Sequence, residues 1–268
     1  MKSFWLGIMG MMVSGYAFAQ PADYTPPELE GIEIEDKAGD FVPLDLEFTD
    51  QEGRVVTLED FLEDGKPLVV QLVYFECPML CNLVINGFVA GAKDLDWSPG
   101  VEYNVISVSF DPQDTAALAK LKQENYVQAL EKPTALDGWN FLVGEPDQVR
   151  SLAEAVGFPY RYLEDQEEFS HGAGMFVLSP KGQISRTLYG ISYPTKELRF
   201  SLMEASEGRL GTPLQKLVLY CFRYDASRHK YGLVAMNVMK IGGALTFAIL
   251  GTFVGLLWVK DKRVARAA

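Results

Sequence analysis

The chain has 268 residues, with 24 basic and 36 acidic side chains and a formal net charge of −12. This length holds one ordinary domain. The negative charge makes nucleic acid and anionic lipid poor partners, and it favours a basic protein surface or a cation.

The first 19 residues have the layout of a secretory signal peptide. Lys2 precedes an apolar stretch over residues 4–13, and Ala17-Phe18-Ala19 forms a small-residue cleavage site before Gln20. The apolar stretch is much shorter than the ~20 residues that a membrane helix needs. We therefore expect cleavage after Ala19, the alternative being an uncleaved N-terminal anchor.

A long uncharged segment lies near the other end of the chain. Residues 241–259 carry no charge and could cross a ~30 Å hydrocarbon layer, so we predict a transmembrane helix over residues 240–260. The alternative is a buried helix of a soluble core. Lys260 at the end of this span and three basic residues of the predicted cytoplasmic tail, residues 261–268, form a basic flank of the kind that stays in the cytoplasm. Both ends predict one inner-membrane (cell-membrane) span, with the main domain on the periplasmic or extracytoplasmic side.

The predicted extracytoplasmic part, residues 20–239, contains 18 basic and 35 acidic residues, a net charge of −17. Residues 20–40 are rich in proline and acid without a steady period, which predicts a flexible tether. Residues 42–61 alternate apolar and polar side chains around a Gly53 turn, which predicts a hairpin, and Thr57 with Asp60 marks a short helix.

The next elements alternate between strand and helix. The run PLVVQLVYF, residues 67–75, is apolar on both faces, as a buried central strand should be. We then predict strands over residues 101–110 and 139–144, a hairpin over 174–190 turning at 180–182, and helices over 83–95, 115–130 (capped by Asp114), 146–158 (with Pro146 near its start) and 194–207. This order predicts an α/β domain over residues 41–207, with a mixed central sheet and helices on both faces. Residues 208–239 would form a juxtamembrane linker.

Two of the three cysteines stand where the central strand leads into the next helix. Open α/β sheets place their chemistry at this end of a strand. Thiols near a helix N-terminus become thiolates more readily. At a spacing of four, Cys77 and Cys81 can face one cation from a single turn, and the same spacing permits a redox or structural disulfide.

A third ligand can be sought among two histidines, His171 and His229. Two thiolates suit Cu(I), and an added imidazole gives a site that also holds Cu(II). His171 lies in a glycine-flanked loop before hairpin 174–190, which in this topology runs beside the strand leading to Cys77. We therefore predict His171 as a ligand, against the alternative of a capping or surface histidine. Cys221 and His229, two helical turns or ~12 Å apart, cannot share one ion directly.

Three segments carry a family resemblance: YFECPMLC, ISVSFDPQDT and FSHGAGMFVLSPKG. In this order and spacing they resemble the signature segments of the Sco/SenC family of thioredoxin-like copper proteins, over about residues 40–207. The resemblance implies a thioredoxin-like fold and a membrane-tethered copper metallochaperone for the binuclear copper site of cytochrome c oxidase. Its expected partners are the copper-receiving oxidase subunit and a thioredoxin-like reductant.

The resemblance also implies roles for individual residues. Cys77, Cys81 and His171 would be the copper ligands, and Cys77 with Cys81 would form the redox disulfide. Asp111 and Asp114 fall in the family's acidic loop and would support the ligands or dock a partner. Their alternative roles are a strand-end turn and a helix cap.

The sequence departs from the family pattern in three places. Asn82 stands where many members have proline, the predicted membrane helix is C-terminal instead of N-terminal, and residues 208–239 have no assigned counterpart. Other functions stay open: a thiol–disulfide oxidoreductase that reduces oxidase cysteines or senses redox state, a thiol peroxidase, or a structural domain with an inert disulfide. Residues 160–179 lack the proline that thioredoxin-like reductants place opposite their thiols, which argues against the first.

Overall fold

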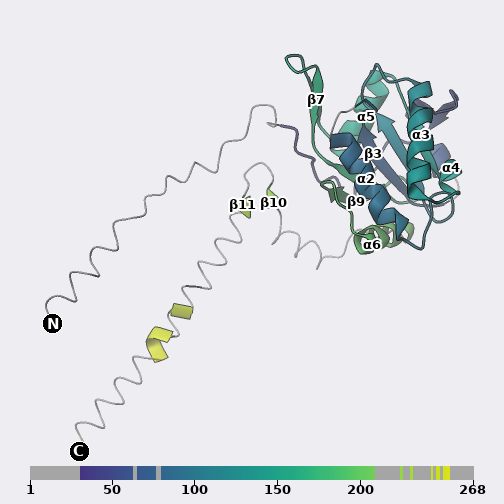
Figure 1. The fold of residues 1–268 in the computed structure, drawn as a ribbon. Helices are drawn as coiled ribbons and strands as arrows, with labels where there is room; N and C mark the ends of the chain where they lie inside the picture. The colour runs from purple at the N-terminus through teal and green to yellow at the C-terminus, as the bar shows by residue number, and fades with distance from the viewer. Residues whose placement is uncertain are drawn as a thin grey trace, which may run out of the picture. The chain divides into compact units, whose positions relative to one another are not determined.

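The computed structural model describes residues 31–62, 65–76 and 80–208, with short pieces at 224–225, 230–231, 243, 246–247 and 250–253. The chain divides into two units, Pro27–Tyr220 and a second one made of Met1–Pro26 with Cys221–Ala268. In the second unit, β10 (Tyr224–Asp225) and β11 (Lys230–Tyr231) form an antiparallel pair. The fold that positions the candidate site belongs to the first unit (Figure 1).

A five-stranded mixed sheet forms the centre of the first unit. Its strands lie in the order β5-β4-β3-β8-β9, where β3 pairs in parallel with β4 and antiparallel with β8. Their bounds are β3 (Leu68–Val73), β4 (Asn104–Ser109), β5 (Trp139–Leu142), β8 (Gly174–Leu178) and β9 (Ile184–Tyr189). All six residues of β3 are buried, because the central strand is covered on both faces, as its continuous apolar run predicted.

Helices cover this sheet. α2 (Leu80–Lys93) contacts both α3 (Ala116–Leu130) and α6 (Thr195–Ser206), and these three helices lie over one face. α5 (Pro146–Val156) lies in the connection from β5 to β8. The contact between α2 and the chain before α6 is very close: a Cβ atom on Gly91 would lie 2.0 Å from the carbonyl oxygen of Tyr193. Glycine is required at position 91 because the contact leaves no room for a Cβ atom.

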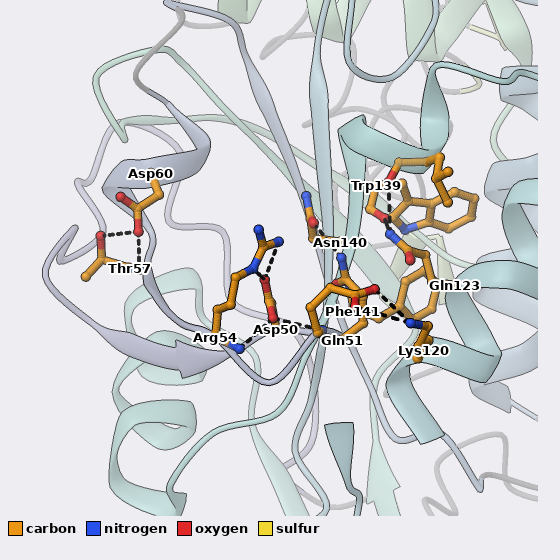
Figure 2. A network of polar contacts seen from close by, with 12 residues as sticks. Asp50, Gln51, Arg54, Thr57, Asp60, Lys120, Gln123, Trp139, Asn140 and Phe141 are labelled. Carbon is orange, nitrogen blue, oxygen red and sulfur yellow. Dashed lines mark hydrogen bonds and ion pairs between the residues drawn. The ribbon is translucent and has the colours of Figure 1, made fainter. Parts of the chain in front are cut away.

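The free margin of β5 is covered by other parts of the chain. β1 (Glu47–Thr49) and β2 (Val55–Thr57) form the predicted hairpin, and Thr49 exchanges backbone hydrogen bonds of 2.7 and 2.9 Å with Val143. The Gln51 side chain accepts a 3.1 Å bond from the backbone N–H of Phe141, and the Gln123 side chain donates a 2.8 Å bond to the carbonyl of Trp139 (Figure 2). Hairpin and side-chain amides thus replace a sixth strand.

Buried polar side chains connect three strands of the sheet. Ser107 on β4 donates a 2.9 Å hydrogen bond to the Gln71 carbonyl oxygen on β3 and accepts one of 2.9 Å from the indole N–H of Trp139 on β5. All three side chains are buried. Such bonds are needed because an unpaired polar group in a core is costly.

The predicted short helix after β2 is confirmed as the 3-10 turn η3 (Glu59–Phe61). The backbone N–H and the hydroxyl of Thr57 donate to the Asp60 carboxylate at 2.6 and 3.1 Å. The predicted hairpin turn at residues 180–182 is confirmed as well, and Gly182 has the positive φ of 75° that such a turn uses.

The structure corrects two expectations. The cap of α3 is Thr115, whose hydroxyl accepts from the N–H of Leu118, and not Asp114. Residues 31–40 are not an exposed tether, because Ile32 is buried and the N–H of Glu35 donates a 2.8 Å bond to the carbonyl of Gly157. The sequence also failed to predict α4 (Ala135–Gly138) and the hairpin of β6 (Tyr160–Leu163) and β7 (Glu168–His171).

The predicted signal peptide, residues 1–19, lies outside the described residues, and so does most of the predicted span over residues 240–260. Gly243, Thr246, Phe247 and residues 250–253 of that span are described, and they are helical. In the described ranges, no helix combines the length and the apolar character needed to cross a membrane.

Candidate metal centre

The candidate ligands belong to the end of β3 and the start of α2. Tyr74 and Phe75, which directly follow β3, are buried, and Glu76 is exposed. Cys77 lies outside the described residues. Cys81 is described only by its backbone, as the second residue of α2.

His171 is the last residue of β7, where it pairs with Tyr160 of β6. The residue is 6% exposed, and the Nδ1 atom of its ring lies 2.7 Å from the carbonyl oxygen of Gly172. A carbonyl oxygen only accepts, so Nδ1 is the protonated nitrogen and donates. In the neutral imidazole the lone pair is then on Nε2, the arrangement found in many metal-binding histidines.

The histidine ring is held among aromatic side chains. The ring centroids of Phe110, Phe158 and Tyr74 lie 5.1, 5.6 and 6.1 Å from that of His171. Phe110 directly follows β4 and Tyr74 directly follows β3, so the imidazole lies at the carboxyl ends of both strands. The prediction that the histidine segment runs beside the strand leading to Cys77 is confirmed as far as Tyr74.

Asp114 fixes the loop that leads to Cys77. Its Oδ2 accepts a 2.7 Å hydrogen bond from the backbone N–H of Phe75 and a short one from the hydroxyl of Ser109. Burial raises the pKa of this carboxyl, the two hydrogen bonds lower it, and the nearby Asp111 and Glu76 raise it further. Asp114 therefore joins the ends of β3 and β4 instead of capping α3.

Asp111 forms the turn after β4. Its backbone N–H donates a 3.1 Å bond to the Ser109 hydroxyl, and its carboxylate accepts a 2.9 Å bond from the N–H of Gln113. This is the strand-end turn that the sequence offered as an alternative to docking. A contact of Asp111 or Asp114 with a ligand or a partner stays a prediction.

The segment before β1 lies against the histidine loop. A Cβ atom on Gly172 would lie 2.8 Å from the Ile34 side chain and 3.1 Å from the carbonyl of Ile32. Residues 32–34 thus limit the room around the residue next to His171. The same segment was expected to be a tether.

Of the predicted site residues, the structure brings His171 and Asp114 to the end of β3. In the described part of the first unit, no three His, Cys, Asp or Glu side chains are grouped to hold a metal ion. Cys77, Cys221 and His229 are outside the described residues, as is the side chain of Cys81. The roles of these residues stay predictions.

Comparison with known proteins identifies the family. The model of the SCO1/SenC family matches residues 35–202. The chain belongs to the SCO1/SenC family. The predicted membership and the thioredoxin-like arrangement of a mixed sheet with flanking helices are thereby confirmed. A comparison with curated proteins gave no match.

Solved structures resemble the first unit of this SCO1/SenC protein. One is an Aquifex aeolicus protein whose name proposes electron transfer, with 27% identity and a TM-score of 0.56 over 66% of this chain and 98% of that one. A Bacillus anthracis SCO1/SenC family lipoprotein has 18% identity and a TM-score of 0.51, covering 65% and 99%. BsSco, named as a member of the Sco family of cytochrome c oxidase assembly proteins, has 20% identity and 0.51, covering 65% and 98%. The last two show the fold alone.

Sequence reasoning missed the aromatic surroundings of His171 in this SCO1/SenC protein. Phe110, Phe158, Tyr160 and Phe169 all lie near the imidazole or beside one another. A signal for them exists, because Tyr160 and Tyr162 on one side, and Phe169 and His171 on the other, alternate with a period of two. Two short alternating runs whose first residues are nine positions apart predict a hairpin.

Proposed function

We propose that this protein is a copper metallochaperone that serves cytochrome c oxidase. Cys77, Cys81 and His171 hold copper and pass it to the copper-receiving oxidase subunit. The observation that carries this proposal is the position of the His171 ring. Its centroid lies 6.1 Å from the ring centroid of Tyr74, and Tyr74 comes only three residues before Cys77. Chain length keeps the Cα of Cys77 within roughly 11 Å of that of Tyr74.

The chemistry of the donors supports copper as the cargo. Two thiolates with one imidazole suit both Cu(I) and Cu(II). The Nδ1–H···O=C bond to Gly172 orients the imidazole with the lone pair on Nε2. Family membership, and the similarity to BsSco, a member of the Sco family of cytochrome c oxidase assembly proteins, support cytochrome c oxidase as the destination.

An anaerobic copper titration of the full chain in detergent tests the ligand set. We expect His171→Ala and His171→Phe to lose the Cu(II) absorption of the wild type while keeping Cu(I) binding by the thiols. The phenylalanine variant retains a ring in the aromatic pocket, so it separates ligation from packing. His229→Ala is the control and should bind as the wild type does. Unchanged Cu(II) affinity and spectrum in a folded His171→Phe variant would rule out the imidazole as a ligand.

A thiol–disulfide oxidoreductase is the second candidate, favoured by the electron-transfer name of the 27% identical Aquifex aeolicus protein. The Cys77 thiolate would attack a partner disulfide, and Cys81 would then displace the reduced partner, leaving a Cys77–Cys81 disulfide. A thioredoxin-like reductant would return the pair to two thiols. Reduction of oxidase cysteines by the copper-free chain, undiminished in His171→Phe, would favour this function.

We further propose that the domain acts on the extracytoplasmic side, anchored by the helix predicted over residues 240–260. The cleavage site after Ala19 and the basic residues after Val259 support this topology. Labelling of Cys77 and Cys81 in intact spheroplasts by a membrane-impermeant maleimide tests it. Labelling only after lysis would contradict the topology.

A further inference from the structure

The hairpin of β6 and β7, residues 160–171, stands apart from the central sheet. Its two strands pair with each other in a sheet of their own, and the hairpin extends beyond the body of the unit (Figure 1, label β7). An isolated two-stranded sheet is only marginally stable in water. The hairpin is therefore held by what packs at its base.

One face of this hairpin is a row of rings. The register pairs Tyr160 with His171 and Tyr162 with Phe169, so these four side chains share a face. The Phe169 ring centroid lies 5.0 Å from that of Tyr162 and 6.2 Å from that of Tyr160. At the base, Phe110 lies 4.8 Å from Tyr160 and 5.4 Å from Phe169. The row runs from the buried His171 out to Tyr162, which is 48% exposed.

The tip of the hairpin is acidic and exposed. It carries four carboxylates against the single Arg161: Glu164, Asp165, Glu167 and Glu168. Glu167 takes a positive φ of 54° in this turn, a conformation that a glycine would adopt more easily. The charge therefore lies just beyond the exposed Tyr162, on the same arm.

We propose that this hairpin is the docking arm for a protein partner whose surface carries lysine and arginine around an apolar recess that receives Tyr162. The inference rests on the proposed function, in which this partner is the copper-receiving oxidase domain. Carboxylates attract a basic surface over several ångströms and raise the association rate. A half-exposed tyrosine on a rigid base loses little conformational entropy on contact, and tyrosine is enriched at the energetic centres of interfaces. A partner that binds Tyr162 is thereby held close to His171, because both residues belong to the same row of rings.

The charge selects this occupant over others. A second copy of the chain would bring its own acidic tip against the first, with a net charge of −17 over residues 20–239 of each. Nucleic acid and anionic lipid are repelled for the same reason. A basic protein surface is the complementary one.

Binding of the copper-free full chain, in detergent, to the soluble copper-site domain of the same organism's oxidase tests the inference. The rates are measured by surface plasmon resonance between low salt and 1 M NaCl. One variant replaces the tip carboxylates by amides (Glu164→Gln, Asp165→Asn, Glu167→Gln, Glu168→Gln), and a second is Tyr162→Ser. The charge-matched control replaces four exposed carboxylates elsewhere: Glu59→Gln, Asp94→Asn, Glu124→Gln and Asp137→Asn.

We expect the tip variant to associate about 10-fold more slowly at low salt and as fast as the wild type near 1 M, where charges are screened. Tyr162→Ser should raise the dissociation rate about 10-fold at every salt concentration. The control variant should bind as the wild type does, with association and dissociation rates that both stay within about 2-fold of the wild-type values. Circular dichroism verifies that each variant is folded.

The outcomes separate this inference from the proposed function. If the wild type binds through the hairpin but delivers no copper, the docking arm stands and the chaperone function fails. If both hairpin variants bind and deliver copper at wild-type rates, the docking arm is wrong and the chaperone function stands. A wild type that does not bind this domain, or that uses Tyr162 for self-association or for anionic vesicles, also overturns the assigned partner.

Discussion

The carboxylate of Asp114 accepts a hydrogen bond of 2.7 Å from the backbone N–H of Phe75, a residue that comes two positions before Cys77. The same oxygen accepts from the hydroxyl of Ser109 at the end of β4. A single atom therefore connects two strand ends next to the proposed thiol ligand. This connection makes Asp114 a positioning residue for the loop.

Replacing Asp114 by alanine should remove both bonds and lower the free energy of unfolding by about 1–3 kcal/mol. Asparagine should have a smaller effect, because its one carbonyl oxygen can accept both bonds. Chemical denaturation compares the two variants. If the loop also positions Cys77, the alanine variant should release Cu(I) to a chelator faster than the asparagine variant does. Equal release rates would limit Asp114 to a role in stability.

The pH dependence of the asparagine variant follows from the raised pKa of Asp114. A carboxyl with a raised pKa in the folded state contributes stability below its unfolded pKa, near 4, and loses it as the pH rises through the folded value. Asparagine is neutral throughout and has no such loss. The free energy of unfolding of Asp114→Asn relative to the wild type should therefore increase between about pH 3 and pH 7. A decrease over that range would mean that the ionised form is the favoured one.

Gly91→Ala should destabilise the protein, although alanine favours an exposed helix over glycine by about 0.5–1 kcal/mol. The added Cβ would lie 2.0 Å from the carbonyl oxygen of Tyr193 and 3.2 Å from its carbonyl carbon. Backbone cannot yield as a side chain does, so we expect a loss of about 1–3 kcal/mol by chemical denaturation. Asn86→Ala, at an exposed position of the same helix, should instead stabilise by a few tenths of a kcal/mol.

Ser107→Ala should lower the free energy of unfolding by about 1–3 kcal/mol. The substitution removes the hydroxyl that bonds to both the Gln71 carbonyl oxygen and the Trp139 indole N–H, and these two groups are buried. Thermal unfolding followed by tryptophan fluorescence measures the loss. Ser151→Ala is the control, since that exposed hydroxyl donates only to the carbonyl of Asp147, and it should change stability by less than about 0.5 kcal/mol.

Asp50 and Arg54 form an ion pair in the β1–β2 turn whose two members should differ in importance (Figure 2). Asp50 also accepts bonds of 2.9 and 2.8 Å from the backbone N–H groups of Glu52 and Arg54. The Asp50 side chain is 2% exposed and that of Arg54 is 69% exposed. We expect Asp50→Ala to cost about 2–3 kcal/mol, because two backbone donors lose their acceptor, and Arg54→Ala to cost about 0–1 kcal/mol. Equal losses in urea denaturation would show that the ion pair itself is decisive.

Much of the sheet could be predicted because local pattern and tertiary position agree. The continuous apolar run of β3 is buried on both faces, and Pro146 begins α5, where a missing N–H does no harm. The β6–β7 hairpin was missed because its turn, Glu164 to Glu167, lacks glycine and proline. Glu167 takes the left-handed conformation, although it is not one of the residue types, such as glycine or asparagine, that usually indicate this conformation in a sequence.

The candidate site was only partly predictable for a related reason. The sequence located His171 near the strand that leads to Cys77, because topology decides which strands are neighbours. It assigned Asp114 to the α3 cap, since an aspartate before a helix usually has that role. Thr115 takes the cap, and Asp114 turns towards Phe75, a residue thirty-nine positions away that no local pattern connects to it.

The covered margin of β5 has a consequence for how this protein meets others. Four backbone groups along it are already hydrogen-bonded: the carbonyl of Trp139 to Gln123, the N–H of Phe141 to Gln51 and both groups of Val143 to Thr49. A foreign strand that approached this border would find these four groups already bonded, and natural proteins use covered edges of this kind to avoid edge-to-edge aggregation. At this border, recognition then depends on side chains, and the carboxamides of Gln51 and Gln123 help to keep two copies of the molecule from pairing edge to edge there.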